Sequence, residues 1–137
     1  MADALPGARV LDLFAGTGAM GLEALSRGAR RLDLVERNPS ALHALKANVA
    51  TLKVRNQTRI FKKDAFTFLR GVEGVAYELA IADPPYGAGL AARIVEIWQT
   101  RPFAGLLLVE TAGDAEMPGG GQTRTSGTTA LHLYGRV

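Results

Sequence analysis

Short apolar runs typical of strands alternate along this chain with stretches of helical period, and this alternation limits the possible folds more than any other feature. Strands are predicted at residues 10–14, 31–36, 58–62, 77–82 and 106–110. Helices are predicted between them at residues 19–26, 38–52, 65–70 and 90–99. Strands and helices that alternate in this way form a parallel sheet with helices on both faces.

The end of the chain departs from this pattern. A glycine loop at residues 119–121 precedes two candidate strands at residues 123–125 and 129–134, which favour an antiparallel hairpin. We therefore expect an α/β, Rossmann-like fold with a mostly parallel sheet of seven strands and a C-terminal antiparallel hairpin. A chain of 137 residues is long enough for one core, so a single domain over residues 1–137 is predicted.

Composition excludes several classes of protein. No apolar run reaches the length of about 18 residues that a bilayer requires, and the first residues lack the features of a signal peptide, so a cytoplasmic protein is expected. Cys is absent and His43 and His132 stand alone, so we expect no disulfide framework and no metal site. The net charge of +3 mildly favours approach to a polyanion and decides nothing alone.

Acidic residues fall where ligands bind in such folds, beyond the carboxyl ends of the strands. They are Asp12, Glu36, Asp64 and Asp83. Gly16 and Gly18 follow the first strand and would let the backbone approach a ligand closely, although an ordinary turn remains the alternative.

The glycine loop and its acids indicate a nucleoside cofactor. Glu36 follows the loop by about twenty residues, the spacing at which an acid accepts hydrogen bonds from a ribose. Gly21 completes the Gly-x-Gly-x-x-Gly pattern of NAD-dependent oxidoreductases, but Asp12 within the strand disfavours a pyrophosphate. S-adenosyl-L-methionine carries a sulfonium and an ammonium and fits better. Asp64 before Ala65 then accepts from the adenine amine or caps a helix.

The stretch "ADPPYG" ends the fourth strand with an unusual corner. Proline has no backbone donor, so the strand stops near Asp83, and Pro84 and Pro85 make the corner rigid. If Asp83 and the Pro84 carbonyl both accept hydrogen bonds from an exocyclic amine, they direct its lone pair toward an incoming methyl group. Tyr86 offers a ring on which an extruded base can stack.

Several segments together resemble the bacterial 16S ribosomal RNA (guanine-N2)-methyltransferases of the RsmD type, which are class I S-adenosyl-L-methionine-dependent methyltransferases. The similarity covers residues 8–136 and rests on "LDLFAGTGAMGLEALSRGA", "ERNP", "DA" before "FL", "ADPPY" and "LHLYGR". The resemblance implies a cofactor site and a catalytic corner. Its cofactor residues are Asp12, Phe14, Gly16, Gly18, Glu36 with the adjacent Arg37, Asp64 and Ala65, and its catalytic residues are Asp83, Pro84, Pro85 and Tyr86.

The resemblance also implies the partner. We expect a monomer that methylates guanine N2 in ribosomal RNA, either free or within the small ribosomal subunit. Family members usually begin with a longer basic segment, whereas here seven residues precede Ala8. Two alternatives therefore stay open: methylation of adenine N6 or another exocyclic amine of a nucleic acid, and a cofactor-binding module without activity of its own.

Overall fold

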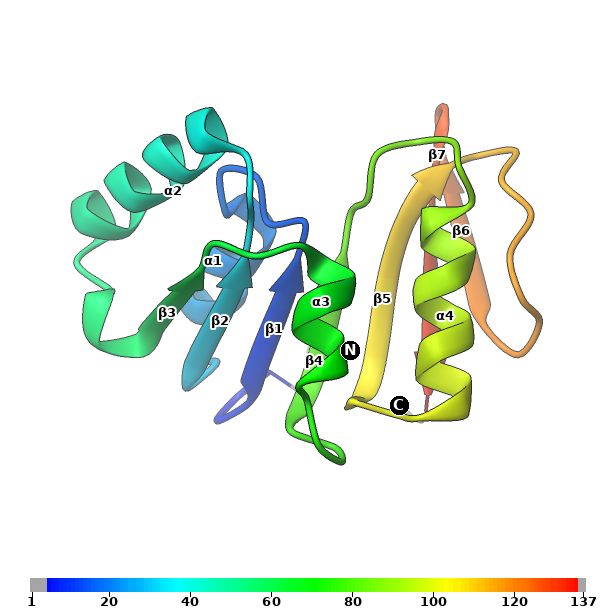
Figure 1. The fold of residues 1–137 in the computed structure, drawn as a ribbon, viewed down its shortest axis with the longest axis horizontal. Helices are drawn as coiled ribbons and strands as arrows, with labels where there is room; N and C mark the ends of the chain where they lie inside the picture. The colour runs from blue at the N-terminus through cyan, green and yellow to red at the C-terminus, as the bar shows by residue number, and fades with distance from the viewer. Residues whose placement is uncertain (1–4, 136–137) are drawn as a thin grey trace.

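A seven-stranded sheet runs through the computed structural model, which describes residues 5–135 (Figure 1). The order of its strands is β3-β2-β1-β4-β5-β7-β6. The first five are parallel to one another, and β7 runs antiparallel to both β5 and β6, as predicted. The strands are β1 (Arg9–Leu13), β2 (Arg31–Val35), β3 (Thr58–Phe61), β4 (Tyr77–Ala82), β5 (Ala104–Ala112), β6 (Gln122–Ser126) and β7 (Thr129–Gly135).

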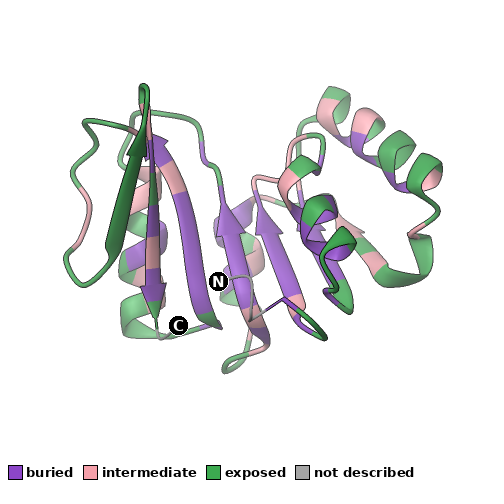
Figure 2. Ribbon diagram, turned by 180° about the vertical axis from the view of Figure 1, so that it is seen from behind, coloured by how far each residue is buried: buried purple, intermediate pink, exposed green. Residues whose placement is uncertain are grey.

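Helices cover both faces of the sheet. Figure 1 shows α3 and α4 on the near side, and Figure 2, seen from behind, shows α1 on the other. The helices are α1 (Ala19–Ser26), α2 (Pro39–Leu52), the short 3-10 turn η2 (Arg55–Gln57), α3 (Ala65–Arg70) and α4 (Leu90–Thr100). None of the helices in residues 5–135 has the length and apolar character needed to cross a membrane.

Two apolar clusters form the core, one on each side of the sheet. Alternating residues of β1 divide between them: Leu11 packs with α3 and α4, whereas Val10 packs with α1 and α2. This alternation follows from the two-residue period of a strand. Because both faces are covered, the central strands are buried, whereas every residue of the edge strand β6 is exposed (Figure 2).

The structure differs from the predicted elements mainly at their ends. β5 extends beyond the expected residues 106–110, because it pairs with β7 from Leu106 through Ala112. Phe14, expected in the first strand, lies beyond β1 because its φ of 57° leaves the extended region. Arg136, the end of the family resemblance, lies outside the described residues.

The strand order places a candidate site. The strand order reverses between β1 and β4, which are parallel neighbours in the sheet although β2 and β3 lie between them in the chain. In open α/β sheets the crevice for a ligand forms beyond the carboxyl ends of the strands at this point. All five parallel strands end on this side, so the segments that follow them meet there.

Candidate functional site

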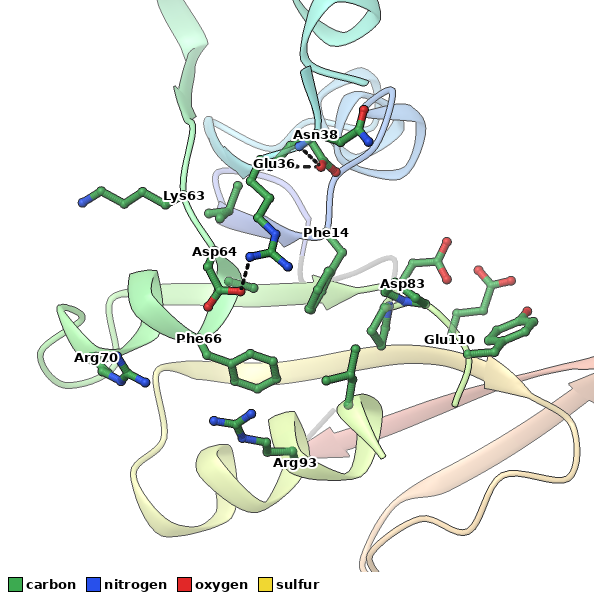
Figure 3. A pocket seen from close by; sticks show the side chains of 17 residues that line it. Phe14, Glu36, Asn38, Lys63, Asp64, Phe66, Arg70, Asp83, Arg93 and Glu110 are labelled. Carbon is green, nitrogen blue, oxygen red and sulfur yellow. Dashed lines mark hydrogen bonds and ion pairs between the residues drawn. The ribbon is translucent and has the colours of Figure 1, made fainter. Parts of the chain in front are cut away.

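A cavity of about 830 Å³ opens beyond the carboxyl ends of the parallel strands (Figure 3). Its volume lies in the range of pockets that bind small molecules. The structure brings most of the predicted site residues to its wall: Phe14, Glu36, Arg37, Asp64, Ala65, Asp83, Pro84, Pro85 and Tyr86. Three predicted residues do not line it: Asp12, Gly16 and Gly18.

The loop after β1 turns sharply beneath the cavity. Phe14, Gly16 and Gly18 have φ values of 57°, 59° and 84°, a left-handed region that glycine occupies easily and a bulky residue rarely does. The unusual conformation of Phe14 places its ring in the cavity wall, where its edge meets Phe66 with ring centroids 6.2 Å apart. Gly18 then stands at the N-terminus of α1. The loop therefore supplies an aromatic wall and a close backbone turn.

Asp12 turns toward helix α1 and away from the cavity. Its carboxylate is buried, and Oδ2 accepts a hydrogen bond of 3.1 Å from the Gly21 backbone N–H. A Cβ at Gly21 would lie 2.8 Å from that oxygen, so the third glycine of the motif permits this close packing. Burial raises the pKa of Asp12 to about 7, with added repulsion from Asp83 and Glu36 and an opposing contribution from the Gly21 hydrogen bond.

Glu36 holds the loop and the start of the next helix together. Its Oε1 accepts from the Gly16 N–H at 2.8 Å, and its Oε2 accepts from Arg37 N–H at 3.0 Å and Asn38 N–H at 2.8 Å. Asn38 in turn caps α2 by accepting from the Ala41 N–H at 3.1 Å. A carboxylate offers about four acceptor positions, so one remains for a ligand.

Asp64 is the N-cap of α3, which was one of the two predicted alternatives. Its Oδ2 accepts from the Thr67 N–H at 3.0 Å. Its other oxygen, Oδ1, lies 3.6 Å from the Arg37 guanidinium at the cavity wall (Figure 3). Because capping uses only one oxygen, the second is left facing this cation and remains accessible to a ligand amine.

The corner after β4 has a different character. The strand ends at Ala82, Pro84 is buried, and the side chains of Asp83 and Tyr86 are exposed, with Tyr86 retaining 59% of its accessible surface. Within residues 5–135, neither of these two side chains has a hydrogen-bond partner. Desolvation by the surrounding residues raises the pKa of Asp83 above the ordinary carboxyl value. The corner thus presents a free acceptor and a free ring at the cavity.

The cavity is also lined by residues outside the predicted site, among them Phe66, Arg93 and Glu110. The guanidinium carbon of Arg93 lies 4.0 Å from the centroid of the Phe66 ring, a cation–π contact that joins α4 to α3. Glu110 lies near the carboxyl end of β5, and burial, together with the charge of Asp83, raises its pKa. Glu110 could have been predicted from the sequence, because it ends the predicted fifth strand just as the other candidate acids lie at or near the ends of their strands.

Known proteins share this architecture. The family model described as "Conserved hypothetical protein 95" matches residues 1–134. The ribosomal RNA small subunit methyltransferase D of Escherichia coli is 33% identical over 121 residues, which cover 86% of this chain and 60% of that relative. The chain thus spans less than two thirds of this curated relative.

Solved structures give the same picture. A conserved hypothetical protein of Streptococcus pyogenes superposes with a TM-score of 0.84 at 27% identity, over 94% of this chain and 86% of the other. An RNA methyltransferase of Salinibacter ruber, solved with S-adenosyl-L-homocysteine, gives 0.74 at 13% identity, over 97% and 83% of the two chains. The predicted class I methyltransferase fold is confirmed. The chain belongs to the conserved hypothetical protein 95 family, and it is similar in sequence to proteins named ribosomal RNA small subunit methyltransferase D.

Proposed function

We propose that this chain transfers a methyl group from S-adenosyl-L-methionine to the exocyclic N2 of a guanine in small-subunit ribosomal RNA. One observation carries the proposal: a single cavity is lined by the acids expected to hold a nucleoside cofactor and by the corner from Asp83 to Tyr86. The relatives named as ribosomal RNA small subunit methyltransferase D support methyl transfer to small-subunit ribosomal RNA.

The residues on the cofactor side of the cavity fit S-adenosyl-L-methionine. The rings of Phe14 and Phe66 form an apolar wall suited to adenine, and the free position on Glu36 suits a ribose hydroxyl. Oδ1 of Asp64 can accept from the adenine amine. The related fold from Salinibacter ruber binds the demethylated product, which supports this cofactor for the fold. When bound, the cofactor supplies a methyl carbon on a sulfonium sulfur, and the electron pair of the broken bond stays on sulfur.

The corner contributes positioning and electrostatics. The guanine amine is a weak nucleophile because its lone pair is delocalised into the ring. Hydrogen bonds from its two N–H groups to the Asp83 carboxylate and the Pro84 carbonyl direct that lone pair outward and stabilise the positive charge that develops on nitrogen. The proton lost from N2 passes to Asp83 or to solvent, while Tyr86 stacks on the base.

The RNA substrate places the activity in the cytoplasm, where ribosomes are assembled. Lys63, Arg70 and Arg93 line the same cavity and offer cationic groups to RNA phosphates. The protein acts as a monomer in this proposal, because a single chain supplies both the cofactor wall and the corner.

Two measurements made together test the proposal. Calorimetry with S-adenosyl-L-homocysteine reports on cofactor binding, and transfer of a labelled methyl group to small-subunit RNA from cells lacking this protein reports on activity. Mass spectrometry then identifies the product, which we expect to be N2-methylguanosine. Binding without transfer to either naked RNA or assembled subunits would contradict the enzyme and favour a cofactor-binding module. N6-methyladenosine would contradict the assigned base.

A further inference from the structure

A second cavity of about 370 Å³ lies against the catalytic corner. It is bounded by residues 84–87, by the start of α4, by the carboxyl end of β5 and by the loop at residues 114–117. Both cavities are lined by Pro84, Pro85, Tyr86, Leu90 and Glu110. Pro84, Pro85 and Tyr86 of the corner therefore stand between the two cavities, and Asp83 lines the larger one.

Glu110 is the one acidic side chain that lines both cavities among the described residues. Ala82 of β4 pairs in register with Val109 of β5, so Asp83 and Glu110 are the next residues on two neighbouring strands. Figure 3 shows their two side chains next to each other at this edge of the sheet. The charge of Asp83 acts on Glu110, as expected at such proximity.

Neither carboxylate is engaged by the protein. Among residues 5–135, no hydrogen bond or ion pair involves the side chain of Asp83 or of Glu110. Two neighbouring carboxylates repel each other and lose hydration as they become buried, so a pair left unpartnered carries an electrostatic cost. That cost falls when a ligand brings hydrogen-bond donors to both groups at once.

Only some bases present two adjacent hydrogen-bond donors that could reach both carboxylates at once. The Watson–Crick edge of guanine presents two adjacent donors, the N2 amine and N1–H. Adenine presents its N6 amine beside N1, which is an acceptor, and cytosine presents its N4 amine beside the acceptor N3. An ionised carboxylate only accepts hydrogen bonds. A pair of carboxylates therefore matches the edge of guanine, and it opposes the edges of adenine and cytosine.

We propose that Glu110 is the specificity-determining residue of the site, accepting a hydrogen bond from N1–H of the target guanine while the corner at Asp83 holds its N2 amine. This inference rests on the proposed function and deepens it, since it names the group that selects guanine over other bases with an exocyclic amine. Reading of an extruded base through its Watson–Crick edge is the general means by which base-modifying enzymes discriminate.

The test uses base analogues in the RNA. Once mass spectrometry has located the methylated nucleotide, RNA fragments are made with guanine or 2-aminopurine at that position. 2-Aminopurine keeps the N2 amine but has an unprotonated N1. The wild-type protein is expected to prefer guanine by about 10- to 100-fold in kcat/KM. In Glu110→Gln, whose amide can donate as well as accept, this ratio is expected to fall to within about 3-fold.

Controls separate this role from a structural one. Glu73→Gln makes the same chemical change in the exposed loop before β4, at the opposite edge of the sheet, and should keep the wild-type ratio. Affinity for S-adenosyl-L-homocysteine and the thermal unfolding temperature should match the wild type in both variants. A wild-type ratio retained in Glu110→Gln overturns the inference and leaves the methyltransferase intact. Absence of transfer to guanine by the wild type overturns the proposed function itself.

Discussion

The two sides of the cavity use their acidic residues differently. On the side formed by β1, β2 and β3, hydrogen bonds from backbone N–H groups are accepted by Glu36 and Asp64 in the cavity wall and by Asp12, which lies outside that wall. On the side formed by β4 and β5, the carboxylates of Asp83 and Glu110 have no such partner within the described residues. In the proposed function, the first group holds the backbone that faces the cofactor, whereas the second stays free for the acceptor.

This difference separates stability from activity. Removing an acid that satisfies buried or capping N–H groups leaves those donors unpaired and destabilises the fold. Removing an acid without a protein partner leaves nothing unpaired, and it also relieves repulsion. Substitutions on the cofactor side should therefore lower both stability and binding, and substitutions at the corner should lower only turnover.

The largest effect is expected from Asp83→Ala. The variant should lose about 10²- to 10³-fold in kcat, the size seen when one group that stabilises developing charge is removed. Its thermal unfolding temperature and its affinity for S-adenosyl-L-homocysteine should match those of the wild type. A marked fall in the unfolding temperature would break the comparison, because it would show that the corner also supports the fold.

A smaller effect, of a few kcal/mol, is expected in the pH dependence of stability through Asp12. Its folded pKa of about 7 lies above the ordinary carboxyl value, so the folded state binds more protons than the unfolded state between about pH 4 and 7. The free energy of unfolding should fall as pH rises through this range. Asp12→Asn keeps an acceptor for Gly21 and should flatten the slope, as measured by urea unfolding at pH 5 and 8.

The loop at residues 114–117 offers a matched control for the pH dependence of stability. Asp114 is exposed, and Asp114→Asn should reproduce the wild-type slope. Equal slopes in the wild type and in Asp12→Asn would show that Asp12 ionises without penalty and is not held as the structure suggests.

Next in size is Glu36→Ala, which removes the acceptor for three backbone N–H groups. We expect a loss of about 1–3 kcal/mol in the free energy of unfolding, because the part-buried Gly16 N–H is left without a partner, whereas the exposed N–H groups of Arg37 and Asn38 can bind water. Weaker binding of S-adenosyl-L-homocysteine should accompany it. Glu23→Ala, which breaks an exposed pair with Arg27 on α1, should change neither quantity appreciably. If Glu36→Ala unfolds with the same free energy as the wild type, the acids on the β1–β3 side of the cavity do not support the fold more than Asp83 and Glu110 do.

The smallest effect is expected from Tyr86, whose ring is exposed. Tyr86→Ala should raise KM for RNA by about 5- to 50-fold through lost stacking, and Tyr86→Phe should stay near the wild type because the ring is kept. Cofactor binding and the unfolding temperature should be unaffected in both. If the Ala variant unfolds earlier, the ring supports the corner and is not reserved for the base.

Much of this molecule was predictable from local patterns. The two-residue and 3.6-residue periods identified the strands and helices, and glycine and proline marked where they end. Once the ends of parallel strands were known, the acids that follow them were expected at one edge. The family resemblance was likewise carried by contiguous segments, so membership did not depend on knowing the fold.

The tertiary structure decided which oxygens remain free. Asp12 turns to Gly21 and Glu36 reaches back to Gly16, contacts over 9 and 20 residues that depend on how the loop packs against its helix. The pairing of β4 with β5 brings Glu110 beside Asp83, although 26 residues intervene between them in the chain. Residue period determines the elements of a chain, but neighbours across a sheet and competition for donors are properties of the assembled fold.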